Sequence, residues 1–175
     1  MARSINLGKV DPLIVLPVKN NVVDVHRAIL TKLFIRHEYY SSKLERRTFN
    51  RSLSLSREEW TKETKRNNTL LLYAVHRSAR QNILGYAFVT VNKLVLHVVK
   101  VAVDVAHRRI GIASRLIKEA LRVARRSCAT LHVDPRNEAA MKLYHSLGFE
   151  LDGILDDYYS PGCPAHKLLL TLEQS

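Results

Sequence analysis

The segment Val101-Ala-Val-Asp-Val-Ala-His-Arg-Arg-Ile-Gly-Ile-Ala-Ser114 carries the clearest structural signal in the chain. Apolar residues alternate at Val101, Val103 and Val105, and this period of two predicts a strand. A basic triplet and one glycine follow, and a helix is expected over Ser114–Arg126. A strand, a short loop and a helix N-terminus in this order direct backbone N–H groups and the positive end of the helix dipole at one point. The segment therefore predicts a pyrophosphate site.

The composition is that of a single globular domain, which we expect to span residues 1–175 with 46% hydrophobic content. No apolar run approaches the ~18 residues of a membrane span, and the first residues lack a signal-peptide core. Cys128 and Cys163 do not have a metal-ligand spacing, and nothing indicates an oxidising compartment. We expect a cytoplasmic protein without membrane association and without a metal.

The net charge of +12, from 28 Lys+Arg against 16 Asp+Glu, attracts polyanions without selecting one. Three candidates are a phosphorylated cofactor, ribosomal RNA and acidic peptides. The basic residues are scattered over Arg46–Arg80 and Arg108–Arg126 and do not form an RNA-binding motif with interleaved aromatic residues. Proximity to RNA thus stays open, whereas sequence-specific RNA reading is not indicated.

The first third of the chain predicts mainly helices. A short strand is expected at Ile5–Val10, helical packing over Asp11–Phe34, and a loop or short helix at Glu38–Arg47. The polar stretch Asn50–Asn68 is either a solvated connector or a lid. Within it, Ser56-x-x-Glu59 resembles a capping box that begins a helix ending at Lys65.

The rest of the chain predicts a sheet with two β-α crossovers, and the order of elements predicts one α/β domain. The expected strands are Thr69–Val75, Asn82–Thr90, Lys93–Val105, Ala129–Val133, Phe149–Gly153 and Lys167–Leu172, with a turn at Arg77–Gln81. After the helix over Ser114–Arg126, a second helix is expected at Glu138–Leu147, closed by Gly148 as a left-handed cap.

Three signatures between Leu96 and Leu172 together resemble the GNAT acetyltransferase superfamily. They are Arg108-x-x-Gly111-x-Ala113, then Asn137-Glu-Ala-Ala-Met-Lys-Leu-Tyr144 with Leu147-Gly-Phe-Glu150, and finally Asp157-Tyr-Tyr159. The last is similar to a tyrosine pair in protein N-terminal α-acetyltransferases. The resemblance implies acetyl-CoA as co-substrate and no metal. It also implies a GNAT fold, in which helices flank a mixed central sheet that is splayed at the CoA-binding strand, here Val99–Val103.

Within this group the chain most resembles the NatE-type catalytic subunit, through Ile5–Pro12 and Ala165-His166. The NatA type is also similar, through His107-Arg-Arg109 and Glu38-x-Tyr40, and residues 35–90 fit neither type well. The NatE resemblance implies acetylation of peptide or nascent-chain N-termini that retain Met before a hydrophobic residue. It also implies a helical-repeat auxiliary subunit and the ribosome as partners. The alternatives are a NatA-like preference for small first residues, acetylation of lysine or small amines, and a catalytically weak ribosome-associated binding subunit.

The resemblance also assigns the cofactor site, in which Gly111 lets the backbone approach the pyrophosphate with an unusual φ. The alternative is a plain turn with surface arginines. The candidate cofactor-binding residues are Val101, Val103, Arg108, Arg109, Gly111, Ile112, Ala113, Ser114, Asn137 and Tyr144.

The candidate catalytic residues are His132, His97 and Tyr144. His97 stands where the NatE type has a tyrosine and the NatA type a histidine, and two histidines on neighbouring strands can pass a proton through a water. Tyr144 would protonate the leaving thiolate. The alternatives are a core histidine and a core tyrosine.

The candidate substrate-binding residues are Glu38, Tyr39, Tyr40, Val99, Tyr158 and Tyr159. Glu38 is also a rival base, although a solvated surface carboxylate explains it as well. The tyrosines would clamp the substrate backbone with a rigid apolar face and one hydroxyl. A relay without a strong carboxylate base suits an α-amine, which is ~20–30% neutral near pH 7.4, better than a lysine at ~0.1%.

Overall fold

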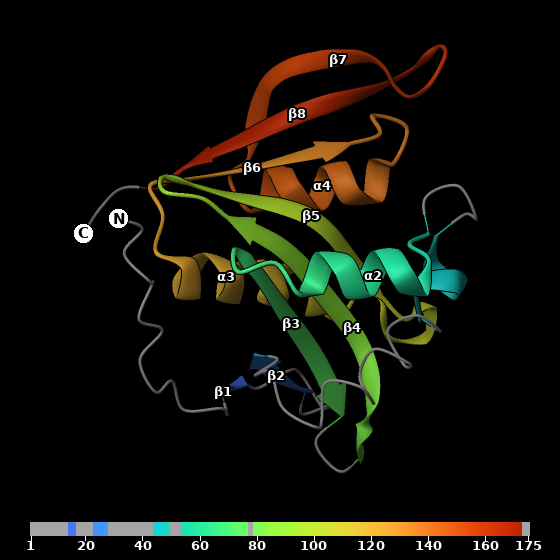
Figure 1. Cartoon of the computed structure of the whole chain (residues 1–175), viewed down its shortest axis with the longest axis vertical. Coiled ribbons are helices and arrows are strands. Elements are labelled where there is room, and N and C mark those ends of the chain that lie inside the picture. Colours follow the sequence, from blue (N-terminus) through green and yellow to red (C-terminus); the bar gives the residue numbers. More distant parts are fainter. Residues whose placement is uncertain (1–13, 17–22, 28–43, 50–53, 77–78, 173–175) are drawn as a thin grey trace.

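The protein is described by a computed structural model that covers residues 14–16, 23–27, 44–49, 54–76 and 79–172. One mixed sheet, flanked by helices, forms the centre of this described part (Figure 1). The strands are β1 (Ile14–Leu16), β2 (Val23–Arg27), β3 (Thr69–His76), β4 (Ala79–Val91), β5 (Val95–Val103), β6 (Cys128–Val133), β7 (Glu150–Ser160) and β8 (Cys163–Thr171). The helices are α2 (Arg57–Thr64), α3 (Ile112–Ala124) and α4 (Glu138–Ser146). Two shorter helical segments are a turn at residues 44–48 and the 3-10 turn η1 (Val105–His107).

The eight strands follow the order β1-β2-β3-β4-β5-β6-β8-β7. Neighbouring strands run antiparallel except β5 and β6, which run parallel and are joined by a crossover through α3. This mixed sheet with flanking helices confirms the predicted fold class.

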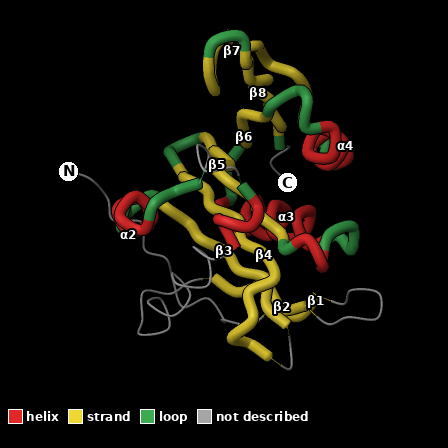
Figure 2. The backbone as a smooth tube through the Cα atoms, turned by 90° about the vertical axis from the view of Figure 1, so that its right-hand side faces the viewer, coloured by secondary structure: helices red, strands yellow, loops and turns green. Residues whose placement is uncertain are grey.

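Both faces of the central strands are buried, because each face is covered by a different helix. Figure 2 shows α2 and α3 on opposite sides of β3 and β4. Alternate residues of β3 divide between the two sides, since side chains alternate along a strand. Leu70, Leu72 and Ala74 pack in the cluster that contains α3, while Leu71, Tyr73 and Val75 pack with Trp60 of α2. The two-sided core fixes the register of the strands that carry the candidate site.

The capping box at the start of α2 is confirmed. The Ser56 hydroxyl accepts from the Glu59 N–H at 3.2 Å, and the Glu59 carboxylate accepts from the Ser56 N–H at 2.8 Å. These hydrogen bonds lower the pKa of Glu59. One turn later the Trp60 ring meets Tyr86 edge-on at 5.0 Å between centroids. The local cap and this buried anchor together place α2 on the sheet.

The helical prediction for Asp11–Phe34 is wrong where the structure describes it, because β1 and β2 are strands. Strand β2 pairs antiparallel with β3 from Val23↔His76 to Arg27↔Leu72. Pairing with an existing strand edge, together with β-branched valines, outweighs the helical spacing of the apolar residues. The predicted order of helices before the sheet is therefore wrong, and Ile5–Val10 lies outside the described residues.

The later elements are confirmed with shifted boundaries. Helix α3 begins at Ile112 rather than Ser114, and strand β4 begins at Ala79, inside the expected turn. Gly148 has the expected positive φ of 89° after α4. Strands β7 and β8 run well beyond the predicted segments and form a long hairpin.

Candidate functional site

Strands β5 and β6 separate at the candidate acyl site. Their register runs from Val95↔Cys128 to Val98↔Leu131, whereas β5 stays paired with β4 as far as Val103. Figure 1 shows the two strands diverging beyond this point. In the β4–β5 register Phe88 faces Lys100 and Val89 faces Val98, so Val99 is an extra residue in a β-bulge. The predicted splay over Val99–Val103 is confirmed. We call the opening between β5 and β6 beyond Val98 and Leu131 the fork, and one backbone edge of β5 faces it.

The loop after β5 has the backbone geometry that an anion site needs. Gly111 is the N-cap of α3 with a φ of 85°, and no side chain caps this helix N-terminus. Arg109 also has a positive φ, 64°, and the Arg108 Nε donates to the Val103 carbonyl at 3.2 Å. The first N–H groups of a helix without a side-chain cap are suited to a phosphate. The loop therefore fits the diphosphate end of a CoA-type molecule.

Two of the predicted cofactor residues offer only their backbone to a ligand. The side chains of Ile112 and Val103 are buried in the core with 2% and 8% exposure, so only their N–H or C=O groups are available to a ligand. Gly85 explains how closely these elements pack, since an added Cβ there would lie 2.8 Å from the Ala102 carbonyl oxygen and 3.2 Å from Ile112. Val101, Ala113 and Ser114 are half-buried at the same end of β5 and α3.

The two candidate catalytic histidines lie together on neighbouring strands. The ring centroids of His97 on β5 and His132 on β6 are 5.0 Å apart. The Nδ1 of His97 is 2.9 Å from the Thr130 hydroxyl, and the Nδ1 of His132 is 3.0 Å from the Tyr158 hydroxyl. The structure thus brings together a histidine pair and a candidate substrate tyrosine.

Both histidines are held towards their neutral form. Burial lowers the pKa of His97, and the neighbouring His132 lowers it further. Burial also lowers the pKa of His132, followed by the charge of Lys167. Neutral imidazoles near pH 7 can accept a proton, which is the property a general base needs.

The hairpin β7–β8 presents the tyrosine pair. Asp157 adopts a φ of 54°, and its carboxylate accepts from the Gly162 N–H at 2.6 Å, which closes the hairpin end. The adjacent Tyr158 is 48% exposed, and its ring contacts Tyr159 edge-on at 4.9 Å between centroids. Burial, with the Tyr158 and Asp134 charges, raises the pKa of Tyr159 to about 12. The Tyr159 hydroxyl is therefore protonated and available as a donor near neutral pH.

Asn137 stands at the start of α4, and Tyr144 lies on its buried face. The side-chain Oδ1 of Asn137 accepts from the Ala140 N–H at 3.2 Å, so Asn137 caps the helix. Tyr144 is 9% exposed and packs on Phe149, with 5.9 Å between ring centroids. Burial, followed by the Tyr159 charge, raises the pKa of Tyr144 to about 12. Its hydroxyl therefore stays protonated near neutral pH.

Three site residues were missed by sequence reasoning. Thr130 lies two positions before His132, so the period of two along the strand was enough to place both side chains on one face. Lys167 faces His132 across the β6–β8 register and pairs with Asp152 at 2.6 Å. Asp152 stands at a register shift between β7 and β8, and no local pattern announces such an irregularity.

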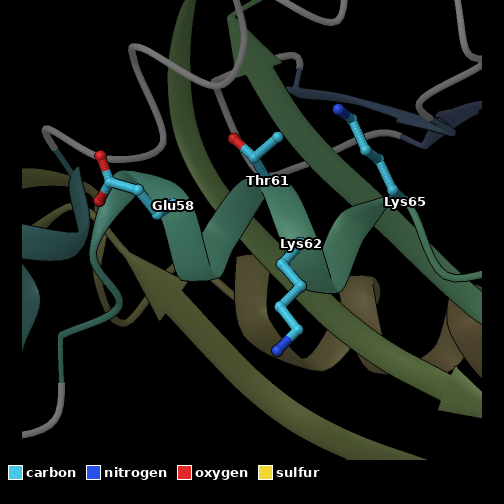
Figure 3. Close-up of a pocket in the computed structure, with 4 residues that line it drawn as sticks. All are labelled: Glu58, Thr61, Lys62 and Lys65. Carbon is cyan, nitrogen blue, oxygen red and sulfur yellow. The ribbon is translucent and has the colours of Figure 1, made fainter.

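Glu38, Tyr39 and Tyr40 lie outside the described residues, whereas Val99 is 40% exposed at the bulge. A separate depression of about 480 Å³ is lined by Glu58, Thr61, Lys62 and Lys65 along α2 and its C-cap. Figure 3 shows these four side chains. The depression contains none of the predicted site residues. Among the described residues no group of three His, Cys, Asp or Glu side chains is arranged to hold a metal ion. The helices of this part of the chain are all too short or too polar to cross a bilayer.

Comparison with known proteins agrees with this geometry. Residues 33–149 match the acetyltransferase (GNAT) family. The chain is 34% identical over 100 residues to the N-terminal acetyltransferase complex ARD1 subunit homolog of Dictyostelium discoideum, covering 53% of this chain and 49% of that protein. It is 37% identical over 79 residues to N-alpha-acetyltransferase 30 of Xenopus laevis, covering 43% and 22%. The matches thus span about half or less of these relatives.

A solved structure extends the likeness over most of the fold. The crystal structure of Arabidopsis thaliana NAA60 in complex with acetyl-CoA superposes with a TM-score of 0.71, covering 85% of this chain and 98% of that one, at 15% identity. At this identity the likeness concerns the fold.

Proposed function

Because the chain belongs to the acetyltransferase (GNAT) family, we propose that it is an acetyl-CoA-dependent protein N-terminal α-acetyltransferase acting as a single domain over residues 1–175. The observation that carries the proposal is the position of the His97–His132 pair on the strands β5 and β6, next to the fork where they part. Acetyl-CoA supplies the activated acyl group. The relatives named as N-terminal acetyltransferases support the class of acceptor.

Acetyl-CoA would be held by backbone groups more than by side chains. Its diphosphate would lie on the N–H groups of Gly111, Ile112, Ala113 and Ser114, with Arg108 and Arg109 supplying positive charge. Its extended arm would pair with the edge of β5 at Val101 and Val103, between that strand and Asn137. When both reactants are held in the fork, the bimolecular step becomes effectively unimolecular. This proximity supplies much of the rate acceleration.

Two proton transfers would accompany acyl transfer, one from the amine and one to the sulfur. The incoming α-amine loses its proton to His132, directly or through a water shared with His97, because both imidazoles are kept neutral. A β5 backbone N–H at the bulge stabilises the negative charge that develops on the acyl oxygen, an effect of ~3 kcal/mol in comparable acyl-transfer sites. Tyr144, which stays protonated, gives a proton to the departing sulfur.

The acceptor peptide would enter over the exposed face of the fork. Val99, Tyr158 and Tyr159 border this approach, and the segment with Glu38, Tyr39 and Tyr40 is proposed to complete it. The NatE-like preference for a retained Met before a hydrophobic residue belongs to this proposal. So do a cytoplasmic location, an auxiliary subunit of an acetyltransferase complex and proximity to the ribosome, which the net charge of +12 favours.

Calorimetry with acetyl-CoA, followed by turnover on three peptides, tests the proposal. The panel contains a Met-Leu peptide, a Ser peptide and an N-blocked peptide whose amine is a lysine. We expect binding and fastest turnover on Met-Leu. Faster turnover on Ser indicates a NatA-like enzyme, and turnover on the blocked peptide alone indicates a lysine acetyltransferase. Binding without turnover on any peptide indicates a binding subunit and refutes the catalytic proposal.

A further inference from the structure

A completely buried carboxylate joins four segments of the chain beside the fork. Glu45, on the helical turn at residues 44–48, is 0% exposed. Its carboxylate accepts from the Leu55 N–H at 3.1 Å and from the Tyr86 hydroxyl of β4, and it pairs with the ammonium group of Lys100 on β5. Burying a charge is expensive unless it is paired and hydrogen-bonded. These partners offset the cost of burying the Glu45 charge, but they do not by themselves explain its role.

Lys100 is the first residue after the bulge. Its side chain is 15% exposed, and its ammonium group lies 4.6 Å from the centre of the Phe49 ring. Glu45 and Phe49 are four residues apart, which places them on one face of a helical turn. Two side chains of the same short segment therefore hold one lysine of β5.

The bulge changes which face of the sheet each β5 residue occupies. Leu96 and Val98 pack in the cluster that contains α3, and so does Val103, although 98 and 103 have opposite parity. The extra residue Val99 accounts for this inversion. Without it, a regular strand would direct position 100 to the α3 core, and every later residue would change face. Lys100 can reach Glu45 only in the bulged register.

We propose that the Glu45–Lys100 pair, with Tyr86, is a positioning device that holds the β5 bulge and so sets the direction in which β5 leaves β6. This inference rests on the proposed function, because the pair would affect catalysis through the β5 backbone at residues 99–103, which is proposed to bind the acyl group. Glu45 has no exposed surface and Lys100 little, so the pair would act on a substrate only through the strand. The pair ties the segment around residue 45 to the strand that would present the acyl group.

A double replacement separates positioning from stability. Glu45→Gln or Lys100→Met alone leaves a charge without its partner, and we expect a lowered thermal midpoint. The combined variant E45Q/K100M removes both charges while keeping similar volume, and replacing a buried ion pair in this way is often neutral for stability. The control is Glu63→Gln with Arg66→Met, which removes a partly exposed ion pair at the end of α2.

We expect E45Q/K100M to keep the thermal midpoint of the wild type while kcat falls by about tenfold or more, since a small displacement of reacting groups is costly. The KM for acetyl-CoA should change little, because the loop at Gly111 is untouched. Hydrogen exchange of the amides at residues 99–103 should rise in E45Q/K100M and not in the control.

The inference is overturned if E45Q/K100M has both the kcat and the 99–103 amide exchange of the wild type. It is also overturned if the control variant reproduces the loss. Hydrogen exchange needs no catalysis, so it tests the inference even if the wild type turns out to be inactive. An inactive wild type with a loosened β5 in E45Q/K100M would refute the proposed function and leave the positioning of the bulge established.

Discussion

Replacing Gly85 with alanine should destabilise the protein at the joint between β4, β5 and α3. An added Cβ would lie 2.8 Å from the Ala102 carbonyl oxygen and 3.2 Å from side-chain atoms of Ile112 and Val103. Ordinary contact begins at 3.4 Å, so the backbone oxygen of Ala102 and position 85 must separate by roughly 0.6 Å. Because both belong to paired strands with buried faces, neither can move alone.

The size of the effect follows from known cases of overpacking, which lower the free energy of unfolding by about 1–3 kcal/mol. For a chain of this length each kcal/mol shifts the thermal midpoint by about 2–4 °C, so Gly85→Ala should lower it by roughly 2–12 °C. Scanning calorimetry measures the shift. The matched control is Gly153→Ala in β7, where an added Cβ meets nothing within 4 Å. Equal midpoints for the two variants would refute the packing argument.

The remaining predictions concern the site. His132→Asn should lower kcat/KM by about 10²–10⁴-fold if His132 is the base, and steady-state rates with the Met-Leu peptide would show no loss if it is not. Lys167→Met removes a charge that lowers the pKa of His132, so the acidic limb of the kcat/KM profile should move to higher pH; an unmoved limb contradicts the coupling. Gly111→Ala meets no atom within 4 Å but needs a φ of 85°, so calorimetry should show weaker acetyl-CoA binding, and unchanged affinity argues against the loop as the diphosphate site. Folding lowers the pKa of His97 and His132 below 6.5. Their contribution to the free energy of unfolding is therefore fully present above pH 6.5, and it is lost as the pH falls through the pKa values of the folded state. Urea titrations should show this loss, and a His97→Gln/His132→Gln variant should reduce it.

Features that depend on local chemistry were predictable. The capping box at Ser56, the cap at Asn137, the positive φ of Gly148 and the loop before α3 all rest on residues a few positions apart. The splay of β5 was predictable only by resemblance to a family, because the valines of β5 alternate in the same way with or without a bulge.

Features that depend on distant parts of the chain were not predictable. Strand β2 forms because β3 offers it an edge, and its partner residues are about fifty positions away. Glu45 lies 41 residues from Tyr86 and 55 from Lys100, and its neighbours in the chain, Leu44 and Arg46, give no sign of a buried carboxylate. The pairing of Lys167 with Asp152 likewise depends on the irregular hairpin register.

The short contact between β5 and β6 has a thermodynamic consequence. Within the described strands, four register pairs link the half-sheet β1–β5 to the half-sheet β6–β8. The antiparallel ladders that join β2 to β5 and β6 to β7 within the two halves are longer. A molecule that hydrogen-bonds to both β5 and β6 would hold the two half-sheets together. At a concentration one hundred times its dissociation constant it stabilises the native state by about 2.7 kcal/mol. Acetyl-CoA bound as proposed would therefore make the two half-sheets unfold more cooperatively.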